Sequence, residues 1–330
     1  MKIAVLDDYS NAFRSMPSFE RLKGHEVVVY HDTVKDTARL AERLHDVDAV
    51  VLTQERSSFR RSLIEKLPKL KLVAQTGSHR GHFDIDACTE HGIAIASLSG
   101  GGMSYSTAEL TWGLILAALR HIPFESEQLK RGAWQSTIGT SLRGKTLGIY
   151  ALGKIGTTVA EVGRTFGMKV MCSGREASQA KAREAGYEVP ESREAFFAQA
   201  DVLSLHIYFN AETRGIVKAA DLACMKPTAL LVNTSRAGLI EAGALVNALK
   251  QGRPGYAAVD VYEDEPVTGA THPLLSLPNA LCTPHLGYAA DSQFRRFYEV
   301  AVDHILAFAS GRPSNIINPK ALTHPRHTKM

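Results

Sequence analysis

Three short segments in the second half of the 330-residue chain each end an apolar run with one reactive side chain. They are LLVNTSRAGLI (230–240), AAVDVYEDEPV (257–267) and LCTPHLGY (281–288), and the side chains are Arg236, Glu265 and His285. A cation, a carboxylate and an imidazole at strand ends can together bind an anionic substrate and move a proton. These residues are therefore candidates for a catalytic site.

A glycine turn upstream predicts a site for a phosphate-bearing cofactor. In TLGIYALGKIGTTVAEVGRTFG (146–167), an apolar strand runs into Gly153, Lys154, Ile155 and Gly156, and a helical pattern follows. Glycine lets the backbone approach a pyrophosphate, and the helix N-terminus offers free N–H groups and a partial positive charge. Ala151 stands where the dinucleotide pattern G-x-G-x-x-G has its first glycine, so an ordinary tight strand-to-helix turn stays open as an alternative.

Composition narrows the class of protein. With 330 residues, 45% of them hydrophobic, the chain can bury a large core and is expected to form two domains. A net charge of +4 without basic blocks does not favour nucleic acid as a partner, and no apolar run is long enough for a membrane span. MKIAVLDDYS does not resemble a signal peptide. The unpaired context of Cys88, Cys172, Cys224 and Cys282 indicates reduced thiols and a cytoplasmic protein.

Short apolar runs and helical stretches alternate along the chain, which predicts α/β architecture. One unit is expected over residues 1–98, with a break at 99–104, a helix at 105–120 and a connection at 132–144. A second unit is expected over 146–287, followed by a helix at 292–310. The last residues, HPRHTKM (324–330), have no apolar pattern and are expected to form a flexible tail.

Four ordered motifs resemble the D-isomer-specific 2-hydroxyacid dehydrogenase family, which includes D-3-phosphoglycerate dehydrogenases and glyoxylate/hydroxypyruvate reductases. They are GKTLG (144–148) running into GKIG (153–156), NTSRAG (233–238), DVYEDEP (260–266) and TPHLG (283–287). The resemblance implies two Rossmann- or flavodoxin-like domains with parallel sheets and an active site in the cleft between them. It also implies a discontinuous substrate domain (1–100 and 289–330), an NAD(P)-binding domain (101–288) and a homodimer built on the cofactor domains.

The same resemblance assigns roles to the site residues. Hydride would pass between NAD(P)H and a small 2-oxoacid or D-2-hydroxyacid, with His285 as the general acid or base and Glu265 bonded to its other ring nitrogen. Arg236 would hold the substrate carboxylate and polarise its ketone. Asp260 would lie near the nicotinamide. The motifs further predict cofactor contacts from Thr234, Ser235, Arg236, His285 and Gly287.

Cofactor preference depends on the end of the strand in KVMCSGREAS (169–178). Enzymes that use NAD usually have an acid here, whereas this chain has Ser173, Gly174 and Arg175. Losing the acid removes repulsion of a 2′-phosphate, and an arginine with nearby hydroxyls can bind one. NADP(H) is therefore favoured, with NAD(H) still possible because Glu176 could reach the ribose.

The loop QTGSHRGHFDID (75–86) looks two residues longer than in the family and carries positive character. We expect Gly77, Ser78, His79 and Arg80 to contribute to substrate binding, together with Arg236. A metal site built from His79, His82 and Asp84 is disfavoured because their spacing does not support one, and no metal is expected. A solvated loop is the remaining alternative.

Two other functions stay open. The chain could be a corepressor-like protein that senses a dinucleotide without catalysis, although all three catalytic residues are kept. It could also be a phosphoglycerate dehydrogenase without a serine-sensing domain, because little sequence follows the last helix. A formate dehydrogenase is disfavoured, because that enzyme needs a Gln beside the histidine and this chain has Thr283-Pro284-His285.

Overall fold

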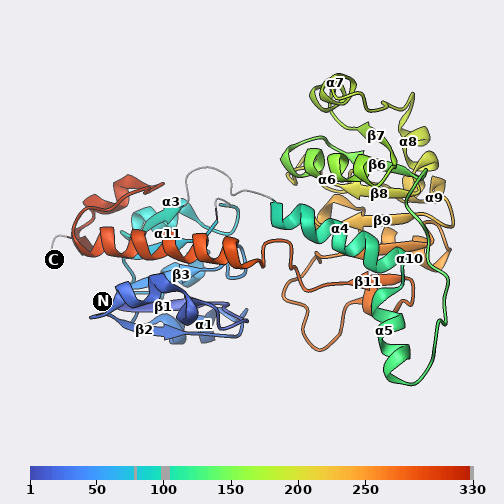
Figure 1. Ribbon diagram of the computed structural model, residues 1–330. Helices are drawn as coiled ribbons and strands as arrows, with labels where there is room; N and C mark the ends of the chain where they lie inside the picture. The colour runs from blue at the N-terminus through green and yellow to red at the C-terminus, as the bar shows by residue number, and fades with distance from the viewer. Residues whose placement is uncertain (78–79, 98–104, 328–330) are drawn as a thin grey trace. The chain divides into compact units, whose positions relative to one another are not determined.

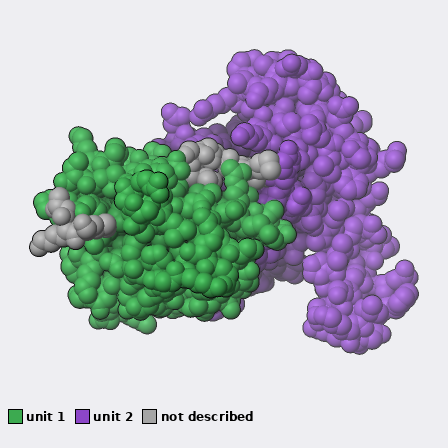
Figure 2. Space-filling view, turned by 60° about the vertical axis from the view of Figure 1, so that its left-hand side comes forward, with its two compact units in different colours: residues 1–102, 291–330 green, residues 103–290 purple. Residues whose placement is uncertain are grey.

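The computed structural model describes residues 1–77, 80–97 and 105–327. The chain divides into two compact units (Figures 1 and 2). Unit 1 comprises Met1–Gly102 and Asp291–Met330, and unit 2 comprises Met103–Ala290. Among the described residues, no helix is long and apolar enough to cross a membrane.

Unit 1 is built on a five-stranded parallel sheet in the order β2-β1-β3-β4-β5. The strands are β1 Lys2–Leu6, β2 Glu26–Val29, β3 Ala49–Leu52, β4 Leu72–Gln75 and β5 Ala94–Ser97. Side chains alternate between the two faces, so Ala4 and Leu6 join one core while Ile3 and Val5 join the other. Helices must cover both faces of such a sheet, as they do in flavodoxin-like folds.

The two faces of this sheet are covered by different parts of the chain. One core takes apolar side chains from α1 Thr37–Leu44, α2 Arg61–Ile64 and α3 Ile85–Glu90. The other takes them from η1 Phe13–Ser15, η2 Pro17–Leu22 and the long α11 Asp291–Ala309. The helix that follows unit 2 in the sequence therefore completes the core of unit 1 (Figure 1).

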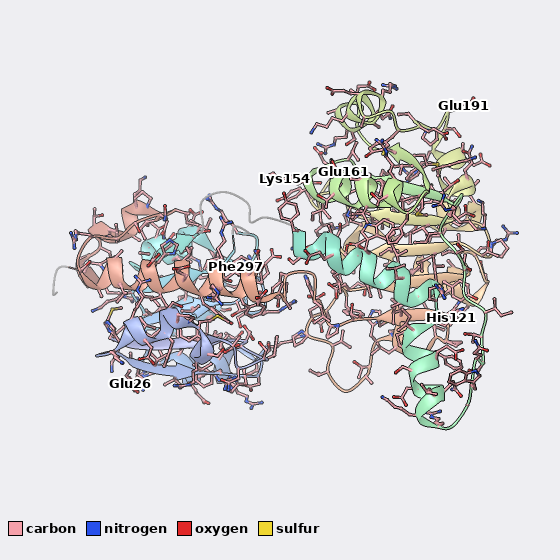
Figure 3. All side chains as sticks on the ribbon, viewed as in Figure 1. Glu26, His121, Lys154, Glu161, Glu191 and Phe297 are labelled. Carbon is pink, nitrogen blue, oxygen red and sulfur yellow. The ribbon has the colours of Figure 1, made fainter. Side chains whose placement is uncertain are left out.

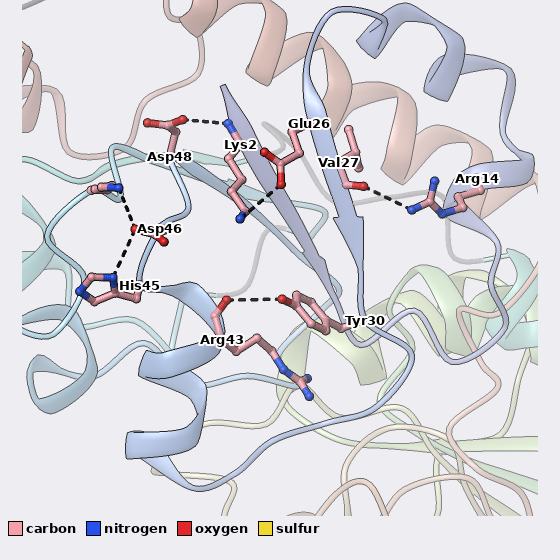
Figure 4. Close-up of polar contacts among 10 residues, drawn as sticks. Lys2, Arg14, Glu26, Val27, Tyr30, Arg43, His45, Asp46 and Asp48 are labelled. Atoms are coloured by element: carbon pink, nitrogen blue, oxygen red, sulfur yellow. Dashed lines mark hydrogen bonds and ion pairs between the residues drawn. The ribbon is translucent and has the colours of Figure 1, made fainter.

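Polar contacts fix the edge of the unit 1 sheet at β2 (Figure 4). Lys2 on β1 pairs with Glu26 on β2 at 3.3 Å, and its backbone N–H donates to the Asp48 carboxylate at 2.8 Å. The Arg43 guanidinium stacks over the Tyr30 ring, with its central carbon 4.2 Å from the ring centroid. The Lys2–Glu26 pair is solvent-exposed and contributes little free energy, so the apolar cores remain the main source of stability.

Unit 2 is built on a six-stranded parallel sheet in the order β11-β10-β9-β8-β6-β7. The strands are β6 Thr146–Tyr150, β7 Lys169–Ser173, β8 Val202–Leu205, β9 Leu230–Asn233, β10 Tyr256–Val259 and β11 Ala280–Cys282. A parallel bridge between Met171 and Glu188 extends the sheet beyond β7. The chain enters at β6 and builds outward in both directions, which is the doubly wound arrangement of dinucleotide-binding folds.

Helices cover both faces of this sheet as well. One core includes side chains from α4 Tyr105–Leu119, α6 Lys154–Thr165 and α7 Glu176–Glu184, and the opposite core uses α8 Arg193–Gln199, α9 Ala219–Cys224 and α10 Ala244–Lys250. Short 3₁₀ helices complete the described elements. In unit 2 they are η3 Ala237–Leu239 and η4 Pro273–Ser276, and in unit 1 they include η5 Pro319–Thr323 and η6 Pro325–His327. Helix α5, Ile122–Lys130, buries none of its residues and projects from the body of unit 2 (Figure 1).

The expected fold class, two α/β units with parallel sheets, is confirmed. Each apolar run predicted as a strand contains one, and the helices predicted over 105–120 and 292–310 correspond to α4 and α11. Helix α5 was not predicted, because it has no buried face to give an apolar period. All four cysteines are free thiols.

The prediction of a flexible tail over 324–330 is wrong for its first part. The Arg326 guanidinium donates to the Leu70 carbonyl at 2.6 Å, and a ring nitrogen of His327 lies 2.8 Å from the Gly92 carbonyl. These contacts are polar, so no apolar pattern in the sequence predicts that this segment is ordered. Residues 328–330 lie outside the described residues.

The segment before this tail covers the outer edge of β5. The Asn318 side chain accepts from Ile95 N–H at 2.8 Å and donates to the Ile93 carbonyl at 2.9 Å and to the Thr89 hydroxyl at 3.1 Å. Asn318 is itself only 5% exposed, so the hydrogen bonds that it makes are shielded from solvent. The Asn318 side chain and the backbone of the preceding residues, which bridges Ala96 through Ile316, thus together pair the backbone groups at this sheet edge.

We predict that Asn318→Ala lowers the free energy of unfolding of unit 1 by about 2–4 kcal/mol, because it leaves buried backbone groups without partners. Chemical denaturation followed by circular dichroism measures the change. Asn247→Ala, at an exposed position of α10, is the matched control and should change stability by less than about 0.5 kcal/mol. Equal effects of the two substitutions would contradict the role given to Asn318.

Candidate functional site

The six parallel strands of unit 2 end at one edge of the sheet, and each is followed by a polar or glycine residue suited to binding or catalysis. These residues are Gly153 after β6, Arg175 after β7, His206 after β8, Arg236 after β9, Asp260 after β10 and His285 after β11. In open α/β sheets, ligands bind outside the carboxyl ends of the strands. The sheet therefore gathers the predicted site residues of unit 2 at the edge where a ligand is expected.

His285 and Glu265 form a hydrogen-bonded pair. The His285 Nδ1 atom lies 2.7 Å from Glu265 Oε2, and only 17% and 15% of the two side chains are exposed. The other carboxylate oxygen accepts from the Tyr262 backbone N–H at 2.9 Å. Because an ionised carboxylate only accepts hydrogen bonds, Nδ1 donates its proton to Glu265, and Nε2 takes no part in this bond. The hydrogen bond expected between these two residues is therefore present.

The turn that carries His285 is held by the buried carboxylate of Asp260. It accepts from the Thr283 hydroxyl at 2.7 Å, from Leu286 N–H at 2.7 Å and from Gly287 N–H at 2.8 Å. Burial raises the pKa of this carboxyl against the three hydrogen bonds, which favour its ionised form. His285 itself has φ +54°, a left-handed conformation that needs such support from its surroundings.

The start of α4 holds the other end of this turn. The hydroxyls of Ser106 and Thr107 both donate to the Gly287 carbonyl at 2.9 Å. A Cβ on Gly287 would come within 3.3 Å of an Asp260 carboxylate oxygen, so the close packing favours glycine. Both backbone groups of Gly287 are therefore engaged within the protein, and a cofactor contact from this residue stays a prediction.

Arg236 follows β9 in a turn with its own hydrogen bonds. The Asn233 side chain donates to the Arg236 carbonyl at 3.0 Å and accepts from Ser235 N–H at 3.0 Å, and the Ser235 hydroxyl donates to the Leu205 carbonyl at 2.7 Å. The buried Thr234 hydroxyl lies 2.8 Å from that of Thr111 on α4. These bonds fix the backbone from which the partly buried Arg236 side chain projects.

The glycine turn between β6 and α6 fits a dinucleotide pyrophosphate. A Cβ on Gly156 would meet the Ala151 carbonyl oxygen at 2.3 Å, so only glycine allows this close approach of helix and turn. A Cβ on Gly153 would have no neighbour within 4 Å, so the space over the turn is open. Gly153 caps α6 without a side-chain bond, which leaves first-turn N–H groups, from Lys154 (labelled in Figure 3) and Ile155 onward, for an anion.

Ala151 adopts φ +77° at the place where the dinucleotide pattern has its first glycine. The turn therefore keeps the left-handed backbone that the pattern requires, at some cost in strain for a residue with a Cβ. The left-handed conformation is therefore present although the residue is alanine and not glycine.

A pocket of about 490 Å³ opens beside this turn, at the ends of β6, β7 and β8. Strand β6 lies between β7 and β8, so the pocket lies at the topological switch point of the sheet, where the connections that follow neighbouring strands run to opposite faces. The lining residues include Gly153, Gly174, Arg175, Ser178 and Lys181, with no acidic residue among those described there. The lining is therefore cationic, and it suits a phosphate-bearing ligand.

His206 lines the same pocket from the end of β8. One ring nitrogen lies 2.9 Å from the Ser204 hydroxyl, and the other is buried. Burial lowers the pKa of the imidazole to about 4, so the ring is neutral at pH 7. The two cationic side chains, Arg175 and Lys181, thus carry the charge of this pocket.

The predicted substrate loop belongs to unit 1. Gly77 follows β4, and the side chains of Gln54 and Gln75 lie 3.3–3.7 Å from where its Cβ would be. Arg80 is exposed, while Ser78 and His79 lie outside the described residues. His82 is buried with a ring nitrogen 3.3 Å from Gln75 Oε1, and Asp84 caps α3 by accepting from Ala87 N–H at 2.9 Å. These contacts give His82 and Asp84 structural roles.

Sequence reasoning missed three residues at this edge. They are Lys181 on α7, His206 after β8, and Glu212 in the loop after β8, whose carboxylate lies 3.1 Å from the Arg175 guanidinium. His206 could have been found by applying to β8 the rule used for the other strand ends, because VLSLH ends in a polar residue after an apolar run. Nothing in the sequence marked Lys181 and Glu212 as site residues, because a charged residue in a helix or loop usually faces solvent.

Comparison with known proteins assigns the family. The NAD-binding domain of D-isomer specific 2-hydroxyacid dehydrogenases matches residues 112–287, which is more than half of the chain. The chain is 36% identical over 266 residues to a glyoxylate reductase of Aeropyrum pernix, with 78% of each chain covered. The chain therefore belongs to the D-isomer-specific 2-hydroxyacid dehydrogenase family, and it is an oxidoreductase that uses a nicotinamide dinucleotide cofactor.

Other relatives carry different names. A D-3-phosphoglycerate dehydrogenase of Methanocaldococcus jannaschii is 35% identical over 84% of this chain, but the match spans only 53% of that protein. In structure, the chain resembles a candidate D-3-phosphoglycerate dehydrogenase oxidoreductase from Ralstonia solanacearum, at 47% identity and TM-score 0.94 with 99% of both chains covered. It also resembles a phosphoglycerate oxidoreductase from Vibrio cholerae, at 47% identity and TM-score 0.90 with 94% of this chain and 99% of that one covered.

We predict that His285→Ala lowers kcat by roughly 10²–10⁴, the usual range for a lost general acid, while affinity for the reduced cofactor changes little. Steady-state kinetics with a 2-oxoacid measure the first quantity, and fluorescence titration measures the second. The matched control is His272→Ala, because His272 also pairs with a glutamate, Glu263, at 2.9 Å. If both variants lost activity equally, or if His285→Ala kept its kcat, His285 would not be the acid.

Proposed function

We propose that this protein reduces a small 2-oxoacid to the D-2-hydroxyacid, with NADPH as its preferred cofactor. The observation that carries the reaction is the His285–Glu265 pair at the sheet edge where the glycine turn lies. The names of the relatives suggest glyoxylate or a phosphoglycerate-related acid as the first substrates to try. The four free thiols support a cytoplasmic location.

In the proposed reaction, a nicotinamide dinucleotide held at the glycine turn from Gly153 to Gly156 would supply the hydride that the carbonyl carbon of the substrate accepts. His285 gives a proton from Nε2 to the carbonyl oxygen, and in the reverse direction it takes that proton back. Glu265 stabilises the positive charge of the ring before the transfer and keeps Nε2 as the active nitrogen. Arg236 binds the substrate carboxylate and polarises the carbonyl with its fork of N–H donors.

We predict that Arg236→Lys loses most of kcat/KM for 2-oxoacids, because lysine keeps the charge but not the two-pronged geometry. The loss should be at least about tenfold, corresponding to 1.4 kcal/mol of transition-state binding. Cofactor affinity, measured on the same preparation, should stay near that of the unaltered protein and serves as the control. Normal turnover with lysine would mean that a point charge is sufficient.

The NADPH preference rests on the cationic pocket. Arg175 and Lys181 line it, and Gly174 stands where an acid would hold the ribose hydroxyls of NADH. Glu176, the residue that could have taken that role, pairs with Arg183 at 3.1 Å. A 2′-phosphate would then meet two cations and the hydroxyl of Ser178.

We predict that Arg175→Gln combined with Lys181→Gln lowers kcat/KM for NADPH by about ten- to a hundredfold and leaves that for NADH nearly unchanged. Charge-assisted hydrogen bonds are worth about 1.5–3 kcal/mol, and 1.4 kcal/mol corresponds to tenfold. The reciprocal exchange Gly174→Asp is less useful, because Gly174 has φ +146° and a Cβ there would lie 3.2 Å from Ser178 Cβ. Lys250→Gln, at an exposed position at the end of α10, is the control. A variant that still prefers NADPH would refute this assignment.

We further propose that the protein is a homodimer formed through α5 and the segment after it. Large apolar side chains there are exposed without a covering element, with Trp134 78% and Ile138 96% in contact with solvent. Ile122, Phe124 and Leu129 on α5 are also about half exposed. An exposed apolar surface of this kind usually marks an interface, and a second copy of the chain is the partner the family resemblance implies.

Sedimentation velocity should therefore give about twice the chain mass of 35.9 kDa. Trp134→Asp with Ile138→Asp should shift the protein to monomer at micromolar concentration, because two like charges cannot be buried unpaired at the interface. Leu275→Asp, at an exposed position of η4, should leave the dimer intact. A monomeric unaltered protein would contradict the proposal.

A further inference from the structure

An ion pair spans the mouth of the cofactor pocket. Arg175 follows β7 and Glu212 lies in the loop after β8, and their side chains meet with Nη2 and Oε2 3.1 Å apart. Since β6 lies between β7 and β8, the pair bridges the ends of two strands that flank the glycine turn. Both side chains are largely exposed, at 74% and 79%, so neither is fixed in place by burial.

We propose that Glu212 competes with the 2′-phosphate of NADPH for Arg175 and thereby sets how strongly the site prefers NADPH over NADH. This inference rests on the proposed NADPH preference and adds a residue to it. The ligand class concerned is any adenosine nucleotide with a phosphate on its 2′-oxygen.

The loop that presents Glu212 is ordered by its own hydrogen bonds. Asn210 N–H donates to the Thr213 hydroxyl at 2.9 Å, Thr213 N–H donates to the Asn210 side chain at 2.9 Å, and the Thr213 hydroxyl donates to the Tyr208 carbonyl at 2.8 Å. Thr213 is buried, and three of the residues in this loop, Tyr208, Asn210 and Thr213, line the pocket. The backbone on both sides of Glu212 is therefore held at the pocket mouth, and only its side chain is free to reorient.

A phosphate bound to Arg175 must displace the Glu212 carboxylate or lie beside it. An exposed ion pair contributes little free energy, so a charged phosphate can displace it. The nearby negative charge still opposes a phosphate that carries about −1.5 to −2 charges. NADH has no 2′-phosphate, so it can bind with the ion pair intact. Glu212 should therefore weaken only ligands that are phosphorylated at this position.

The test uses adenosine 2′,5′-bisphosphate, which carries this end of NADPH alone, and 5′-AMP as the ligand without the 2′-phosphate. Isothermal titration of the full-length protein at low ionic strength should show Glu212→Gln binding the bisphosphate roughly two- to tenfold more tightly, with 5′-AMP unchanged. The ratio of kcat/KM for NADPH to that for NADH should rise by the same factor. Glu184→Gln, an equal change of net charge at the far end of α7, should have no effect on either ligand.

Unchanged or weaker binding of the bisphosphate by Glu212→Gln would overturn the inference. Arg175→Gln separates the two levels of the argument. If Arg175→Gln weakens the bisphosphate but Glu212→Gln does not strengthen it, competition by Glu212 is refuted and the NADPH assignment stands. If Arg175→Gln leaves the bisphosphate unaffected, the proposed role of Arg175 fails and the inference fails with it.

Discussion

The proposed catalytic arrangement depends on the hydrogen bonds that the buried carboxylate of Asp260 accepts. Asp260 directly follows β10, and its carboxylate accepts three hydrogen bonds, from Thr283, Leu286 and Gly287. It therefore shapes the turn in which His285 is held at a positive φ. The same turn is anchored from its other side by hydroxyls at the start of α4. The Glu265 carboxylate then lies 2.7 Å from His285 Nδ1, because the two residues follow the neighbouring strands β10 and β11, which are paired in a fixed register. A carboxylate that contacts no substrate would in this way determine where the proton donor lies.

The second requirement, a site for the dinucleotide, follows from the order of the strands. Placing β6 between β7 and β8 leaves a gap at the carboxyl edge where the connections turn to opposite faces of the sheet. The glycine turn opens this gap to a pyrophosphate, and the residues after β7 and β8 decide its charge. Arg175 after β7 and Lys181 on α7 would attract a 2′-phosphate, whereas the Glu212 carboxylate in the loop after β8 would repel it. We infer that cofactor preference is a balance between them.

Much of this could be predicted from the sequence, because each strand of a buried parallel sheet is a continuous apolar run whose end is easily located. Gly153, Arg236 and His285 could each be assigned to a strand end for that reason. The contacts between strand ends could not be predicted in the same way. Arg175 and Glu212 are 37 residues apart, and nothing local to either residue indicates the other. Helix α5 and the docked end of the chain were missed because their contacts are not apolar and periodic within this chain.

The most direct test of the central claim is a panel of 2-oxoacids, containing glyoxylate, hydroxypyruvate, 3-phosphohydroxypyruvate, pyruvate and phenylpyruvate, assayed with NADPH and NADH in parallel. Our account predicts reduction of at least one of these acids, with kcat/KM for NADPH at least about tenfold above that for NADH. A clear preference for NADH would refute the role assigned to the cationic pocket. Tight binding of a dinucleotide without turnover of any acid in the panel would contradict the account as a whole, and it would instead favour a sensing protein that keeps the fold of the family.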